Sequence, residues 1–139
     1  MISSISNYFL KDIGIDLGTA NSLVYLKGKG IVINEPSIVA INKKTNQVLA
    51  IGDEAKKMMG RAPSHVSVIR PLTNGVISDF EITQEILRHY FRKISGNKFF
   101  NYHRAVIGIP TNLTEVERKS VEDAAISSGA TKVYLVEEP

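Results

Sequence analysis

The second half of the sequence alternates helical and strand-like segments, and this order limits the folds open to the chain more than any other feature. Helical spacing is clearest in residues 81–95, where apolar side chains recur every four positions: Ile82, Ile86, Tyr90 and Ile94. Residues 104–109 and 132–136 are short apolar runs typical of buried strands. A helix that connects two strands of one sheet makes a crossover, so we expect these strands to be parallel.

Residues 114–128, between those two strands, predict a second helix. Thr114 and Glu117 form the T-x-x-E pattern of a capping box, in which each side chain satisfies a backbone donor of the first turn. Small residues make up the face expected to pack on the sheet: Val116, Ser120, Val121, Ala124 and Ala125. On the first helix, His89 is expected on the polar side.

The first half is dominated by strand-like segments joined by tight turns. Residues 12–17, 22–26 and 31–34 are expected to form three antiparallel strands with glycine-containing turns between them. The stretch from Pro36 to Pro71 then predicts a second hairpin and a short helix: residues 37–41, 48–51 and 53–59. We therefore expect an α/β fold, with one mixed sheet, flanking helices and a small inserted β/α subdomain.

Composition removes several classes of function. The chain has 139 residues, which suits one domain, and its net charge of +3 is far from the dense basic face of a DNA-binding protein, so we expect no nucleic-acid partner. The absence of cysteine excludes disulfides, thiolate metal sites and cysteine nucleophiles. The three histidines are scattered along the sequence without metal-ligand spacing.

The sharpest chemical motif is DLGTAN (Asp16–Asn21), which places a carboxylate at the end of a strand and a glycine-containing turn after it. Backbone N–H groups in such a turn can form a concave phosphate site, to which Thr19, Asn21 and Ser22 could add side-chain donors. Asp16 could then hold a hydrated Mg²⁺ beside the phosphates. An ordinary hairpin turn, with Asp and Asn as turn formers, explains the same residues equally well.

A second candidate site is the sequence VEEP (Val136–Pro139), at the end of the last predicted strand. Carboxylates at the carboxyl end of a parallel strand lie where α/β sheets bind ligands, and one could orient a water for attack on a phosphate. From this motif alone, two solvated carboxylates are the better explanation. Because the sequence stops directly after a core strand, we expect a further covering helix beyond Pro139.

Two segments are candidates for contact with a membrane surface. Phe99 and Phe100 lie in a polar loop, where core packing is the commoner role of an aromatic pair and contact with a membrane or partner is the alternative. Residues 1–10 are expected to form an N-terminal tail. A membrane-surface helix is the weaker interpretation of this tail, because Lys11 is its sole nearby cation.

Several segments, in the same order from Lys11 onward, resemble the MreB family of bacterial actin homologues. They are DIGIDLGTANSLVYLKGKGIVINEPSIVAI (Asp12–Ile41), EAKKMMGRAP (Glu54–Pro63), IRPLTNGVISDFE (Ile69–Glu81), AVIGIPTNLTEVER (Ala105–Arg118) and GATKVYLVEEP (Gly129–Pro139). Actin-fold sugar kinases and chaperone ATPases share only the D-x-G-T pattern and the order of strands. The resemblance implies a mixed five-stranded ribonuclease H-like (actin-type) sheet. Residues 11–35 and 72–139 would form an incomplete subdomain IA, and residues 36–71 the small subdomain IB.

The resemblance also implies a function: a protomer of an ATP-dependent, membrane-associated filament that organises cell-wall synthesis and maintains cell shape. Asp16 would face Mg²⁺ through water, and Glu138 would position the attacking water. The ATP phosphates would be bound by the turn residues: Gly18, Thr19, Ala20 and Asn21.

The same resemblance implies partners and a location. Phe99 and Phe100 match the place of the family's membrane-contacting loop, and residues 36–71 would contact the next protomer. The implied partners are further copies of the protein, the membrane surface and the cell-wall synthesis machinery, and the implied location is the cytoplasm at the inner face of the cell membrane.

Two other classes of function stay open. A phosphotransferase of the actin superfamily would need an acceptor pocket and a catalytic aspartate, for which the sequence offers no signature. The other class is a non-catalytic fragment that only packs against partners. Because the family's second phosphate loop and adenosine-binding domain lie outside these 139 residues, we expect the chain alone to be inactive as an ATPase.

Overall fold

The computed structural model describes residues 10–72, 79–95, 102–111 and 113–138. Within these ranges the elements follow one another in this order: β1 (Leu10–Leu17), β2 (Asn21–Leu26), β3 (Gly30–Pro36), β4 (Val39–Asn42), β5 (Val48–Ile51), α2 (Asp53–Lys57), β6 (Val66–Ile69), α3 (Phe80–Ser95), β7 (Tyr102–Pro110), α4 (Glu115–Ser127) and β8 (Ala130–Glu138). Phe99, Phe100 and residues 1–9 lie outside the described residues. Leu10 was expected to belong to the N-terminal tail, but it begins β1.

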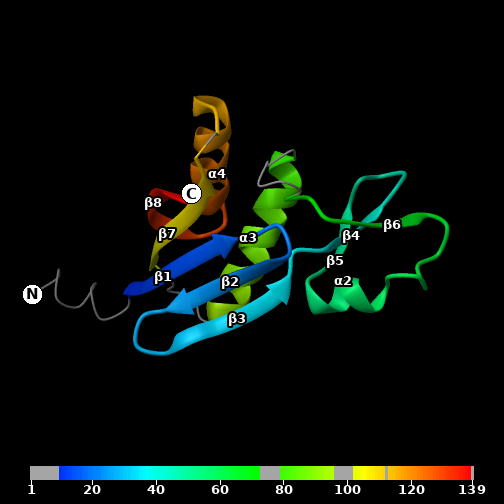
Figure 1. Cartoon of the computed structure of the whole chain (residues 1–139), viewed down its shortest axis with the longest axis horizontal. Coiled ribbons are helices and arrows are strands. Elements are labelled where there is room, and N and C mark those ends of the chain that lie inside the picture. The colour runs from blue at the N-terminus through cyan, green and yellow to red at the C-terminus, as the bar shows by residue number, and fades with distance from the viewer. Residues whose placement is uncertain (1–9, 73–78, 96–101, 112, 139) are drawn as a thin grey trace, which may run out of the picture.

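The main sheet has five strands in the order β3-β2-β1-β7-β8 (Figure 1). β2 pairs antiparallel with both β1 and β3, whereas β7 pairs parallel with both β1 and β8. In the centre, Ile15 of β1 pairs with Val24 on one side and Ile107 on the other. The predicted mixed five-stranded sheet is therefore confirmed.

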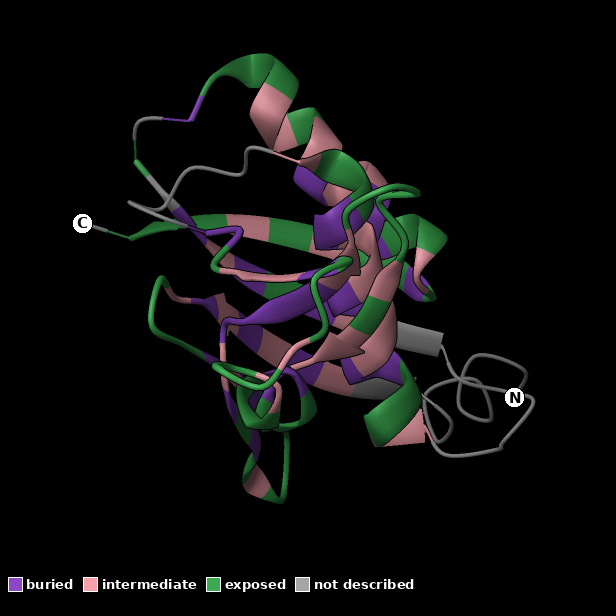
Figure 2. Ribbon diagram, turned by 90° about the vertical axis from the view of Figure 1, so that its right-hand side faces the viewer, coloured by how far each residue is buried: buried purple, intermediate pink, exposed green. Residues whose placement is uncertain are grey.

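Helices α3 and α4 pack on one face of this sheet and form the main core with it (Figure 2). Ile13 and Ile15 of β1 point into this core, as do Leu87 of α3 and Val121 of α4. Fully burying one such side chain stabilises the fold by roughly 1.5–3 kcal/mol, so the alternating pattern of β1 fixes which face meets the helices.

The opposite face of the sheet carries large apolar side chains that remain exposed: Tyr25 (52% exposed), Val106 (44%) and Tyr134 (55%). We call it the open face. An ion pair crosses this face, because Arg104 donates from Nε to Asp12 Oδ1 at 2.6 Å and from Nη2 to Oδ2 at 3.0 Å.

A second, three-stranded sheet in the order β5-β4-β6 forms within residues 37–71 and lies beside β3, away from β7 and β8 (Figure 1). Its small core joins Ile38, Ala40, Ala55 of α2 and Val66 of β6. The predicted hairpin and short helix are present, but β6 was not predicted. This strand is four residues long, and its pattern is too short to show a period.

Helix α4 begins where it was predicted to begin, but the face that it packs on the sheet differs from the predicted one. Thr114 Oγ1 accepts from the Glu117 amide at 3.2 Å, and Glu117 Oε2 accepts from the Thr114 amide at 2.8 Å, which completes the capping box. Val116, however, is 76% exposed. It lies five residues from the buried Val121 and therefore about 140° around the helix.

No helix in the described ranges is long and apolar enough to cross a membrane.

Candidate functional site

Two carboxylates meet at the end of the open face, on strands that are not neighbours. Asp16 is the second-last residue of β1 and lies beside Gly108 of β7, and Glu138 ends β8 on the other side of β7. A side chain at position 108 would put its Cβ 2.2 Å from Glu138 Oε1. Gly108 therefore leaves the space through which Glu138 leans across β7 toward Asp16.

The charge of Asp16 acts on Glu138. Desolvation over β7 raises the pKa of Glu138 above its ordinary value of 4.5, and the charge of Asp16 raises it further. Asp16 and Glu138 also line the same hollow of about 390 Å³ on the open face. A cation placed between such groups would relieve their repulsion.

The available side chains suit Mg²⁺ better than a metal ion whose ligands all come from the protein. Mg²⁺ typically takes one or two carboxylates and fills its other positions with water and phosphate oxygens. Asp16 supplies such a carboxylate, and the described residues contain no group of three or more acidic or histidine ligands. A bound phosphate would have to complete the coordination.

The raised pKa of Glu138 predicts a pH-dependent stability. The folded chain binds this proton more tightly than the unfolded chain, so the contribution of Glu138 to stability falls as the pH rises from 4.5 through the raised value. Glu138→Gln should therefore unfold at a higher temperature than the native protein at pH 7, and at the same temperature near pH 4. Thermal unfolding of residues 1–139 at both pH values measures this.

Glu137→Gln is the matched control for that measurement. Glu137 forms an ion pair with Arg118 of α4, on the helix-covered face. Its loss should not stabilise the chain at pH 7. Equal stability of Glu138→Gln and the native chain at pH 7 would contradict the electrostatic account.

The turn between β1 and β2 lies next to Asp16. Thr19 and Ala20 are exposed there. A Cβ at Gly18 would lie 2.4 Å from the backbone oxygen of Asn21, so the turn closes this tightly only with glycine. Asn21 is also exposed, and its side-chain amide donates to Asn34 Oδ1 of β3 at 3.1 Å. The predicted turn residues and Asp16 are thus brought together.

Ser22 was expected to donate toward this site, and that expectation was wrong. In β2 the buried positions alternate through Ser22, Val24 and Leu26, which places Ser22 on the helix-covered face. Its Oγ lies 2.9 Å from Oγ of Ser37, another buried serine, which follows β3. Ser37 was not predicted as a site residue, and its place directly after Pro36 is the signal that could have found it.

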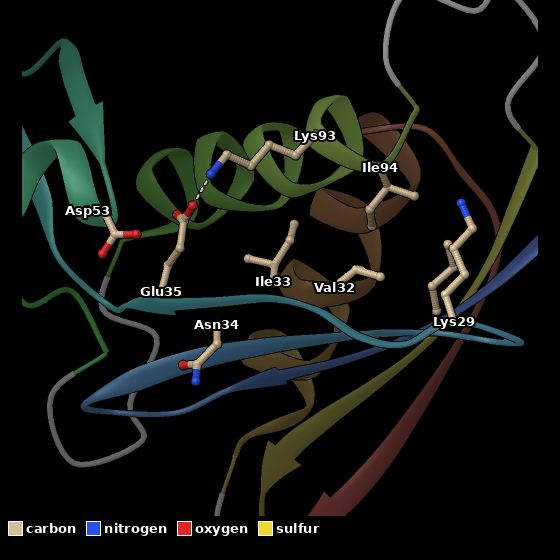
Figure 3. A pocket seen from close by; sticks show the side chains of 9 residues that line it. Lys29, Val32, Ile33, Asn34, Glu35, Asp53, Lys93 and Ile94 are labelled. Atoms are coloured by element: carbon tan, nitrogen blue, oxygen red, sulfur yellow. Dashed lines mark hydrogen bonds and ion pairs between the residues drawn. The ribbon is translucent and has the colours of Figure 1, made fainter.

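A buried glutamate that sequence reasoning missed joins β3 to α3 (Figure 3). Glu35 is 4% exposed and forms an ion pair with Lys93, which Figure 3 marks with a dashed line. Glu35 Oε2 also lies 3.2 Å from His89 Nε2, so the polar neighbour that His89 of α3 meets is this buried carboxylate. The signal was available, because Glu35 follows Ile33 at an inward position of an alternating strand.

Sheet order and site together define a class of protein. A mixed sheet ordered β3-β2-β1-β7-β8, a tight glycine turn after its central strand, and a small sheet inserted after β3 are the features of an actin-type domain. Among solved structures, the MamK double helical filament shares this fold, with 23% identity and a TM-score of 0.76 over 94% of this chain and 41% of that one.

Closer comparisons give the family. The family model described as "MreB/Mbl protein" matches residues 10–139, and the chain belongs to this family. It is 53% identical over 131 residues to the cell shape-determining protein Mbl of Bacillus subtilis, covering 94% of this chain and 39% of Mbl. It is 42% identical over 144 residues to the cell shape-determining protein MreB of Escherichia coli, covering 100% of this chain and 42% of MreB.

A solved structure supports the same relationship. MreB5 of Spiroplasma citri, bound to ADP, is 38% identical with a TM-score of 0.79, over 91% of this chain and 38% of that one. The chain spans about two fifths of the length of the curated relatives. The predicted resemblance to MreB is confirmed.

Proposed function

We propose that these residues form one wall of an ATP site in a protein that hydrolyses ATP and assembles with copies of itself. The observation that carries the proposal is the convergence of Asp16 and Glu138 over Gly108, next to the tight Gly18 turn. The crystal structures of the related MreB5 bound to ADP and to AMPPNP support adenine nucleotides as the ligand.

Each residue of the site receives a role from its position. The backbone N–H groups of Gly18, Thr19, Ala20 and Asn21 would bind phosphate oxygens. Asp16 would hold Mg²⁺ through water, and the ion, when bound, would neutralise charge on the phosphates. Glu138 would accept a hydrogen bond from the attacking water and so orient it.

At the level of the cell, we propose an actin-like filament at the inner face of the cell membrane that organises cell-wall synthesis. The names of the Mbl and MreB relatives, both cell shape-determining proteins, support this assignment. Phe99, Phe100 and the N-terminal tail are the proposed membrane contacts, and further copies of the chain and the cell-wall synthesis machinery are the proposed partners.

ATP affinity tests the proposal. We call the form in which these residues are followed by the rest of the family's chain the full-length form. The full-length form should bind ATP, whereas residues 1–139 alone should bind it roughly tenfold more weakly or worse, because affinity needs groups that converge from both walls. Calorimetry with ATP and Mg²⁺ measures both, and the same titration with EDTA is the control.

Each outcome bears on a different statement. A full-length form that does not bind ATP would contradict the proposed function. Equal affinity of both forms would contradict the view that these residues supply only one wall of the site.

A further inference from the structure

Two buried serines lie directly beneath the tight turn that follows β1. Ser22 is fully buried, and Ser37 is 2% exposed. They come from different segments, since Ser22 belongs to β2 and Ser37 follows the end of β3. Buried hydroxyls need partners, so their hydrogen bonds show what they hold in place.

Ser37 holds the turn at two points. Its hydroxyl donates to the carbonyl oxygen of Gly18 at 2.6 Å, and its backbone amide donates to the carbonyl oxygen of Ala20 at 2.9 Å. Two alternate carbonyls of the turn are thereby drawn toward the same residue. The anchor comes from outside the hairpin of β1 and β2, because Ser37 follows β3.

The donor and the acceptor of each hydrogen bond in this network can be assigned. A serine hydroxyl carries one hydrogen, and that of Ser37 is used on the Gly18 oxygen, which can only accept. In the 2.9 Å contact between the two hydroxyls, Ser22 must therefore be the donor and Ser37 the acceptor. Ser22 thus fixes the rotamer from which Ser37 reaches Gly18.

Fixing the Gly18 carbonyl also fixes the next N–H group. The peptide bonds of the described residues are trans, so the Thr19 N–H points away from the Gly18 carbonyl oxygen. With the oxygen held at buried Ser37, the Thr19 N–H faces the outer side of the turn. Without that bond, the peptide after Gly18 could rotate easily, because glycine tolerates most backbone conformations. Its carbonyl oxygen would then face, and repel, a phosphate.

We propose that Ser37, supported by Ser22, is a positioning residue for phosphate binding, which keeps the Thr19 N–H aimed at the ligand. This inference rests on the proposed ATP site and adds to it a residue that does not touch the nucleotide. Its consequence is selective: loss of the Ser37 hydroxyl should weaken ligands held by their phosphates and spare ligands held by their base and sugar.

The test compares ATP with adenosine in the full-length form. Ser37→Ala should weaken ATP binding roughly 3- to 10-fold, the effect of losing one hydrogen bond, and leave adenosine binding unchanged. Ser22→Ala should weaken ATP binding less, because Ser37 keeps its own bond to Gly18. Competition calorimetry gives both affinities, and thermal unfolding gives stability.

Ser128→Ala is the matched control. Its hydroxyl also bonds a backbone carbonyl, with its oxygen 2.6 Å from the carbonyl oxygen of Ala124 and 3.2 Å from that of Gln84, but at the end of α4. It should lower stability to a similar extent without changing ATP affinity. If Ser37→Ala fails to fold, Ser37→Cys, which keeps the size of the side chain and a weak donor, replaces it with the same expected selectivity.

Unchanged ATP affinity in Ser37→Ala, or a parallel loss of ATP and adenosine, would overturn the inference while leaving the proposed function in place. A native full-length form that binds adenosine but not ATP would overturn both.

Discussion

Glu138→Ala in the full-length form is expected to slow ATP hydrolysis by about 10²-fold, the usual contribution of a positioned base, while ATP affinity changes little. The side chain lies over Gly108 at the strand end, next to Asp16. From there it can accept a hydrogen bond from a water without holding the nucleotide. Single-turnover hydrolysis measures the rate, and calorimetry measures the affinity.

Glu137→Ala provides the matched control for this prediction. The two glutamates are neighbours in β8 and point to opposite faces, and Glu137 pairs with Arg118 of α4. Hydrolysis should therefore survive its removal. A greater loss of rate in Glu137→Ala, or an abolished affinity for ATP in Glu138→Ala, would show that the roles are assigned to the wrong residues.

Asp16→Asn should reduce Mg²⁺-dependent hydrolysis by about 10- to 100-fold, the range seen when a group that holds a metal through a bound water or ligand is removed. The amide keeps the size of the side chain but removes the charge that would attract Mg²⁺. The fold should persist, because Asp16 lies on the open face and not in the core. A titration of the hydrolysis rate with Mg²⁺ should show a higher midpoint.

Asp12→Asn is the control that separates the metal from general electrostatics. Asp12 lies four residues earlier on the same strand and the same face, where it pairs with Arg104. Its replacement removes one negative charge at the far end of β1. If both variants shift the Mg²⁺ midpoint equally, or if neither does, Asp16 does not hold the ion.

The parts of the fold that depend on local pattern could be predicted from the sequence. The four-residue spacing of apolar side chains located α3, and Thr114 with Glu117 located the start of α4. Val116 was misplaced because the whole small-residue stripe was taken as one face, although five positions along a helix turn a side chain away from the sheet. The strand β6 is too short to show any period.

The residues of the site could be predicted from the sequence, but their arrangement in space could not. Asp16 and Glu138 were found because each lies at the end of an apolar strand. That Gly108, which has no side chain, lies between them depends on the register of three strands. The contact between Ser37 and Gly18 joins residues 19 positions apart, which no local pattern reveals. The alternation of β2, by contrast, would have placed Ser22 correctly on the helix-covered face.

The place of β1 in the sheet has a consequence for how the protein is made. β1 leaves the ribosome before the other strands of its sheet, yet it lies at the centre of the sheet, and its partners on β7 come 92 residues later. At about 5–20 residues per second, synthesis of that interval takes roughly 5–20 s. Hairpin pairing of β1 with β2 needs only about 1–10 μs. The nascent hairpins therefore wait for seconds with one edge of β1 unpaired, which makes this interval the one in which chaperone protection matters most.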